Sequence, residues 1–164
     1  MALALPTDKP LHQMVQRVWL TEDGLPATTI LSLAQDPQGY LWIGTQEGLV
    51  RFDGMDFEIW DRSRDPLLTN NKINTLEVAR DGTLWIGTYN GLNSFDGTSF
   101  KAFTEKDGLG SGRVWDIVED REGDIWLGTD GGGLSHISDG KLERFGEEAG
   151  LTNLRVTGLA LNPR

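Results

Sequence analysis

The sequence predicts an all-β protein made of four-stranded antiparallel β-propeller blades. Three observations support this fold class: one segment occurs three times, glycine is frequent, and short apolar stretches alternate with polar residues. The 164 residues include 21 glycines and six tryptophans. We expect a partial propeller of about three complete blades, with one lone strand before them and another after them.

The repeat is easiest to follow through a Leu/Ile-Trp-Ile/Leu-Gly-Thr motif. Its tryptophans are Trp42, Trp85 and Trp126, which lie 43 and then 41 residues apart. Matching glycines flank the motif in each copy, so chance similarity does not explain it. A period of this length with a glycine and aromatic signature is typical of propeller blades. We expect the indoles to fill the space between blades and the motif glycines to admit a neighbouring chain segment.

Four strands are expected in each copy, and in the first copy they fall at residues 30–35, 40–45, 49–52 and 57–60. The alternating apolar pattern indicates strands, and no helix of useful length is predicted. Asp-Gly pairs suit the hairpin between the third and fourth strands, because glycine tolerates a positive φ. These pairs are Asp53-Gly54, Asp96-Gly97 and Asp139-Gly140.

The ends of the chain match only parts of a repeat. A lead at residues 1–13 precedes a partial propeller at 14–164, in which residues 14–20 resemble a fourth strand and residues 154–162 a first strand. A closed ring has about four to eight blades, so we expect a piece of a longer receptor whose remaining blades complete the ring. Closure by a homodimer stays open but is disfavoured, because the strand types at the junctions do not match. The three blades are expected at about 29–61, 72–104 and 113–146.

Composition and residue types argue against several classes of function. A net charge of −10 repels nucleic acid and anionic membrane surfaces, and no apolar stretch is long enough to span a bilayer. The chain has no cysteine, and its two histidines, His12 and His136, occupy non-equivalent positions, so no metal or cofactor is predicted. Residues 120–124 are rich in oxygen ligands, but the other copies lack them, which disfavours calcium. No carboxylate pair indicates acid–base catalysis, so no catalytic residue is predicted.

The unit TEDGLP-x3-I-x4-QD-xx-GYLWIGTQEGLVRFDG at residues 21–54 resembles the two-component regulator propeller repeat. The resemblance runs from about Pro10 to Asn162. In that family many repeats form one or two propellers in the extracytoplasmic sensor region of a histidine kinase, a hybrid two-component system or a diguanylate cyclase. The resemblance therefore implies a periplasmic sensor that forms homodimers through the full receptor. The start MALALP is consistent with the last residues of a signal peptide.

The leading functional hypothesis is a non-enzymatic sensory or ligand-binding propeller segment of a bacterial signal-transduction receptor. Ligand binding in such a segment shifts its packing against the following linker and biases a membrane-connected dimer between two states. Two alternatives stay open. One is a structural or protein–protein interaction propeller, and the weaker one is a fragment of a propeller lyase or hydrolase, because the fold alone does not define a function.

The candidate ligand site lies in the loops that join the fourth strand of one blade to the first strand of the next. These loops share one rim, differ most between copies, and three of the four end in a base. With nearby amides and two aromatic rings, they suit an unknown small molecule such as a carbohydrate or an anionic metabolite. A solvated rim that only keeps the domain soluble, with Trp115 packed between blades, is the competing interpretation. The candidate residues are Lys72, Arg113, Arg155, Asn70, Asn71, Asn153, Tyr89 and Trp115.

Overall fold

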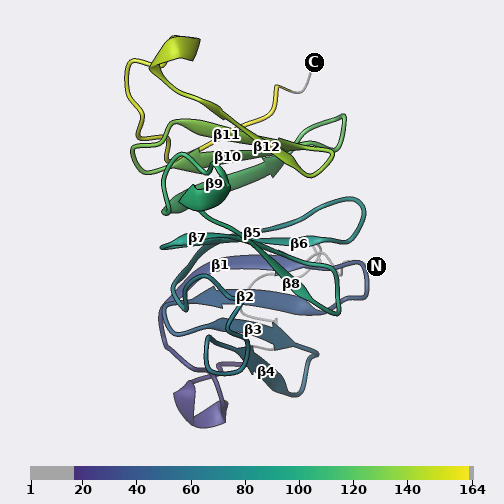
Figure 1. The fold of residues 1–164 in the computed structure, drawn as a ribbon. Helices are drawn as coiled ribbons and strands as arrows, with labels where there is room; N and C mark the ends of the chain where they lie inside the picture. The colour runs from purple at the N-terminus through teal and green to yellow at the C-terminus, as the bar shows by residue number, and fades with distance from the viewer. Residues whose placement is uncertain (1–16, 163–164) are drawn as a thin grey trace, which may run out of the picture.

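Three four-stranded antiparallel sheets lie side by side in the computed structural model, which describes residues 17–162 (Figure 1). This arrangement confirms the predicted fold class of propeller blades. The first blade contains β1 (Ile30–Gln35), β2 (Leu41–Thr45), β3 (Leu49–Phe52) and β4 (Phe57–Trp60). The second contains β5 (Ile73–Val78), β6 (Leu84–Thr88), β7 (Gly91–Phe95) and β8 (Phe100–Phe103), and the third contains β9 (Val114–Glu119), β10 (Ile125–Thr129), β11 (Leu134–Ser138) and β12 (Lys141–Phe145).

The only helical turns within residues 17–162 are short 3₁₀ turns, which lie before the first blade, between the second and third blades, and after the third blade. They are η2 (Thr21–Asp23), η3 (Glu105–Asp107) and η4 (Glu147–Ala149). In this part of the chain no helix has the length and hydropathy needed to cross a membrane.

Each sheet follows the order of the sequence because consecutive strands are joined by tight turns. In the first blade, Gly54 takes a φ of 105°, and the carboxylate of Asp53 accepts the backbone N–H groups of Met55 and Asp56. These hydrogen bonds lower the pKa of Asp53, since they stabilise its ionised form. The predicted Asp-Gly hairpins are therefore confirmed, and in the third blade Asp139 itself adopts a left-handed φ of 49°.

Aromatic packing joins the first two blades. The side chain of Trp42 is only 3% exposed, and its ring centroid lies 5.4 Å from that of Trp60 and 5.7 Å from that of Phe95 in the second blade. The equivalent Trp85 and Trp126 are half-buried. Burial of this aromatic area, together with neighbouring leucine and isoleucine side chains, stabilises the interface.

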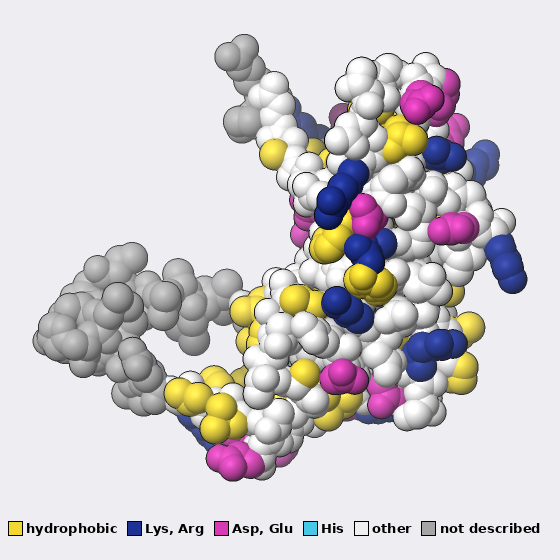
Figure 2. All heavy atoms as spheres, turned by 90° about the vertical axis from the view of Figure 1, so that its left-hand side faces the viewer, with side chains coloured by type: hydrophobic (Ala, Val, Ile, Leu, Met, Phe, Trp, Pro, Cys, Tyr) yellow, Lys and Arg dark blue, Asp and Glu magenta, His cyan; other side chains and the backbone are white. Residues whose placement is uncertain are grey.

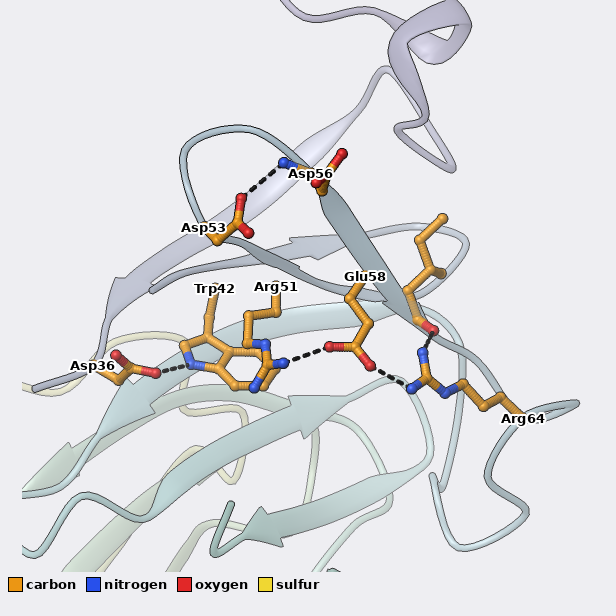
Figure 3. A network of polar contacts seen from close by, with 8 residues as sticks. Asp36, Trp42, Arg51, Asp53, Asp56, Glu58 and Arg64 are labelled. Carbon is orange, nitrogen blue, oxygen red and sulfur yellow. Dashed lines mark hydrogen bonds and ion pairs between the residues drawn. The ribbon is translucent and has the colours of Figure 1, made fainter. Parts of the chain in front are cut away.

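A network of polar contacts surrounds the buried indole of Trp42 (Figure 3). Asp36 accepts a hydrogen bond of 2.8 Å from Trp42 Nε1, which satisfies the only polar atom of the ring. Arg51, next to the indole, pairs with Glu58 at 2.6 Å, and Glu58 also accepts from Arg64. The two guanidinium groups lower the pKa of Glu58, with the Arg64 hydrogen bond contributing most.

A glycine in the second strand of each blade lets the next blade approach closely. A Cβ on Gly87 would lie 2.5 Å from Thr75 Cγ2 and 2.8 Å from Val114 Cγ1, the latter in the first strand of the third blade. Gly44 meets Ile73 in the same way, and Gly128 meets Val156. The expectation that these glycines admit a neighbouring segment is confirmed.

The two terminal segments expected to be lone strands pair with no strand among the described residues. Residues 154–162 were expected to form a first strand, but the structure has only an isolated bridge between Arg155 and Asp130. In each blade the first strand pairs with the second strand of its own sheet, and the described chain offers no such partner after Arg155. Residues 17–20 are likewise not in a strand, while residues 14–16 and the lead at 1–13 lie outside the described part.

The Gly87→Ala substitution should lower the free energy of unfolding by about 1–3 kcal/mol, because the new methyl group must displace both Thr75 and Val114. Urea denaturation followed by tryptophan fluorescence measures this change. Gly158→Ala is the control, since no atom lies within 4 Å of its added Cβ, and it should change stability by less than about 0.5 kcal/mol. Equal effects of the two substitutions would contradict the close-approach explanation.

Candidate functional site

Five side chains form a continuous row of contacts on the rim where fourth strands connect to first strands. Lys72 Nζ lies 4.5 Å from the ring centroid of Tyr89, and Arg113 Cζ lies 3.6 Å from the same centroid. Arg113 Nη1 donates to Asp130 Oδ2 at 2.8 Å, and Arg155 Nε lies 3.2 Å from Asp130 Oδ1. We call these five residues the rim ladder.

The repeat itself builds the rim ladder. Each cation directly precedes the residue that packs on the glycine of the preceding blade, as Arg113 precedes Val114. The partners Tyr89 and Asp130 each directly follow the second strand of their blade. The backbone N–H of Tyr89 donates to the carbonyl of Lys72, and that of Asp130 donates to the carbonyl of Arg113, both at 3.0 Å. Arg113 is therefore held between Asp130 of its own blade and Tyr89 of the blade before it.

The rim ladder is positively charged, although the chain as a whole is acidic. It carries three cationic groups and one carboxylate, whereas the whole chain has a net charge of −10. Figure 2, which faces the left-hand side of Figure 1, shows Lys and Arg side chains alternating with hydrophobic ones down the middle of this face. Tyr89 is 39% exposed, and the side chain of Arg113 is 25% exposed, so solvent and small molecules can reach both.

Trp115 lies beside the rim ladder because β9 contains a bulge. The pairing of β9 with β10 shifts between Val114 and Asp116, and this leaves Trp115 as the extra residue. The same shift occurs in β1 and β5, so the bulge is part of the repeat. Bulges redirect side chains, and the Trp115 ring lies 5.3 Å from Arg113 Cζ. Its indole N–H is buried without a hydrogen-bond partner in the described part of the chain.

The three predicted asparagines do not join the rim ladder. Asn70 Oδ1 accepts the N–H of Lys72, and Asn153 Oδ1 accepts the N–H of Arg155, both at 2.9 Å. Asn71 Oδ1 accepts the N–H of Arg62. These amides shape the turns that carry the cations, a usual role of asparagine side chains in loops.

Asp130 is the ladder residue that the sequence reasoning missed as a site residue. It follows the Gly-Thr pair of the third copy at the position that Tyr89 has in the second. This equivalence was the available signal, but the contact with Arg155 depends on how one blade is placed on the next.

Three segments of the chain match the family described as Two component regulator propeller, at residues 24–47, 67–90 and 108–131. The second segment contains Lys72 and Tyr89, and the third contains Arg113 and Asp130. The chain contains three two component regulator propeller repeats. The resemblance inferred from the sequence is thus confirmed, and most of the rim ladder lies inside the matched segments.

The chain resembles parts of larger proteins. Histidine kinase P4 of Formosa agariphila is 45% identical over 38 residues, which are 23% of this chain and 3% of that protein. The extracellular domain of BT3049 from B. thetaiotaomicron, named as a hybrid two component system, has a TM-score of 0.76 and 22% identity over 85% of this chain. Virginiamycin B lyase from Staphylococcus aureus has a TM-score of 0.57 and 18% identity over 72% of this chain.

The two structural similarities are below 25% identity, so they show the shared propeller fold alone. This chain spans 20% of the BT3049 domain and 41% of the lyase, so it covers only part of each.

Away from the rim ladder, carboxylates of the third blade affect the pKa of a carboxyl group in the second blade. Burial raises the pKa of Glu77 on β5, and the negative charges of Glu119 and Asp116 raise it further. A carboxyl group whose pKa is higher in the folded than in the unfolded state destabilises the fold once the pH rises above its unfolded value. Glu77 therefore lowers the stability of the propeller blades at neutral pH.

Glu77→Gln should raise the free energy of unfolding near pH 7 and leave it nearly unchanged at about pH 3, where the carboxyl group is protonated in both states. Urea denaturation at the two pH values measures the difference. Glu47→Gln serves as the control, because Glu47 is exposed. A loss of stability for Glu77→Gln at neutral pH would show that the buried charge is compensated.

Proposed function

We propose that this chain is a non-enzymatic segment of a periplasmic sensor domain in a bacterial signalling receptor, and that it binds an anionic small molecule or carbohydrate at the rim ladder. The observation that carries the binding proposal is the convergence of Lys72, Arg113 and Arg155 on two shared partners. The repeat family and the relatives named as a histidine kinase and a hybrid two component system support the receptor context.

The electrostatics of the rim ladder favour an anion. Asp130 is shared by Arg113 and Arg155, so one carboxylate balances two guanidinium groups. Within residues 17–162 the ammonium group of Lys72 contacts the ring of Tyr89 and pairs with no carboxylate. A guanidinium group has five N–H donors, of which Arg113 uses one on Asp130. A carboxylate, phosphate or sulfate group of a ligand can accept from the remaining donors in a paired geometry.

Aromatic surface at the same place favours a ligand with a ring. The exposed part of Tyr89 and the adjacent Trp115 present apolar surface next to charged donors. Binding sites for small molecules commonly combine such surface with a few polar groups that fix the orientation. An acidic sugar has both features, a flat ring face and a negative charge.

The placement of the cations on different blades suggests how binding is transmitted. Lys72 belongs to the second blade, Arg113 to the third, and Arg155 to the segment after the third. A ligand held by two of them resists movement of one blade against the next. Such a ligand shifts the population of blade arrangements only if it contacts one arrangement better than another.

A protein-interaction role is the second candidate, and one observation favours it. Ile30 and Leu33 on β1 are 40% and 59% exposed, whereas their counterparts Ile73 and Leu76 on β5 are buried against the first blade. The outer face of the first blade therefore offers apolar surface for another blade or protein. A propeller lyase or hydrolase stays a weaker alternative, because the likeness to virginiamycin B lyase concerns the fold.

Isothermal titration with glucuronate, glucose 6-phosphate and glucose tests the binding proposal. At least one of the two anionic probes should bind, neutral glucose should bind more weakly, and added salt should reduce the anion affinity. Arg113→Ala should weaken anion binding by about tenfold or more, equivalent to about 1.4 kcal/mol. Arg62→Ala, an exposed cation in the same set of loops, should leave it unchanged.

Two results would contradict the binding proposal. One is equal loss of affinity in the Arg62 and Arg113 variants, which would indicate diffuse electrostatic attraction. The other is the absence of binding for all three probes while circular dichroism shows a folded β protein.

A further inference from the structure

In the third blade, two residues that differ from their counterparts in the other copies lie close together, at the rim opposite the rim ladder. Asp124 precedes β10, whereas Asp130 of the rim ladder follows it. His136 pairs across the sheet with Trp126, as Arg51 pairs with Trp42 in the first blade. The residues at the position of Asp124 in the other copies are Tyr40 and Thr83, and those at the position of His136 are Arg51 and Ser94.

The side chains of these two residues meet a third potential ligand. His136 Nε2 lies 3.1 Å from Asp124 Oδ2. One carboxylate oxygen of Asp120 joins them, so that the three ligand atoms all lie within 4.8 Å of one another. The imidazole ring is stacked on Trp126 with centroids 4.2 Å apart, which limits its orientation. All three side chains are half-buried, and an ion from solvent can reach them.

The structural demands of the repeat account for Asp120 but not for the other two. Asp120 accepts the indole N–H of Trp126 at 2.8 Å, as Asp36 accepts that of Trp42 in the first blade. The first blade holds the same turn without a carboxylate at position 40 or an imidazole at position 51. The turn therefore does not require the pair of Asp124 and His136, because the equivalent Tyr40 and Arg51 of the first blade meet in a cation–π contact of 4.5 Å instead.

We propose that Asp120, Asp124 and His136 bind one divalent transition-metal ion, with Zn²⁺ as the best match. One imidazole nitrogen and two carboxylate oxygens are donors that zinc accepts, with a remaining position for water or a further ligand. Calcium prefers an all-oxygen set, so the histidine argues against it. The indole N–H of Trp126 orients the Asp120 carboxylate, as outer-shell donors do in metal sites. A bound ion ties the turn before β10 to β11.

Titration of the chelator-treated chain with zinc sulfate in a calorimeter tests this site. We expect one equivalent to bind and the side-chain ¹⁵N signal of His136 to shift at Nε2. His136→Ala and Asp124→Asn should each weaken zinc binding at least about tenfold, since even outer-shell changes have effects of that size. Asp36→Asn is the matched control, because it alters the equivalent turn of the first blade and should leave zinc binding unchanged.

Three outcomes would overturn the metal site. They are no zinc binding by the folded unsubstituted chain, unchanged affinity in Asp124→Asn, and equal weakening by Asp36→Asn and His136→Ala. Asp124→Asn keeps the shape of the side chain, so it remains informative if His136→Ala does not fold. His12→Ala, at the other histidine of the chain, should not change the stoichiometry.

Discussion

The close approach of the segment that follows each blade to a glycine in the second strand of that blade is the contact on which the rest of the structure depends. Ile73 meets Gly44, Val114 meets Gly87, and Val156 meets Gly128 at the same relative position. This contact leaves no room for a side chain and therefore fixes how far one blade is displaced along the next. Aromatic packing and the rim contacts then form around a spacing that is already set.

That fixed spacing places the cations of successive repeats in a row along one rim. Because Arg113 directly precedes Val114, the contact of Val114 with Gly87 brings the guanidinium onto Tyr89. The next repetition brings Arg155 to Asp130. The two rims are separated by the length of the second strand. Substitutions in the rim ladder therefore need not affect the cluster of Asp120, Asp124 and His136, and the reverse is also true. A shared scaffold with variable ends is a common basis for different binding functions in one fold.

Much of the fold could be predicted from the sequence because its signals are local. The spacing of Trp42, Trp85 and Trp126 gives the period, and the Asp-Gly pairs give the hairpins. The terminal strands could not be predicted in this way, since a strand forms only where a partner strand pairs with it. Residues 154–162 have the pattern of a strand but lack that partner in the described chain.

The sequence identified the three cations that the rim ladder contains but not the contacts between them. Lys72, Arg113 and Arg155 stood out because each ends a variable loop, whereas the role of Asp130 depends on the displacement between blades. The cluster of Asp120, Asp124 and His136 was missed for a related reason. Asp124 and His136 are 12 residues apart in sequence, and only the pairing of β10 with β11 brings them together.

A crystal structure of the Gly87→Ala variant tests most directly whether the interblade glycine sets the rim ladder. We expect the third blade to shift and Arg113 Cζ to move beyond 3.6 Å from the Tyr89 ring, while Arg155 keeps its contact with Asp130. If Arg113 stays on Tyr89 at an unchanged distance although the added methyl group has displaced Val114, the rim contacts do not depend on the glycine.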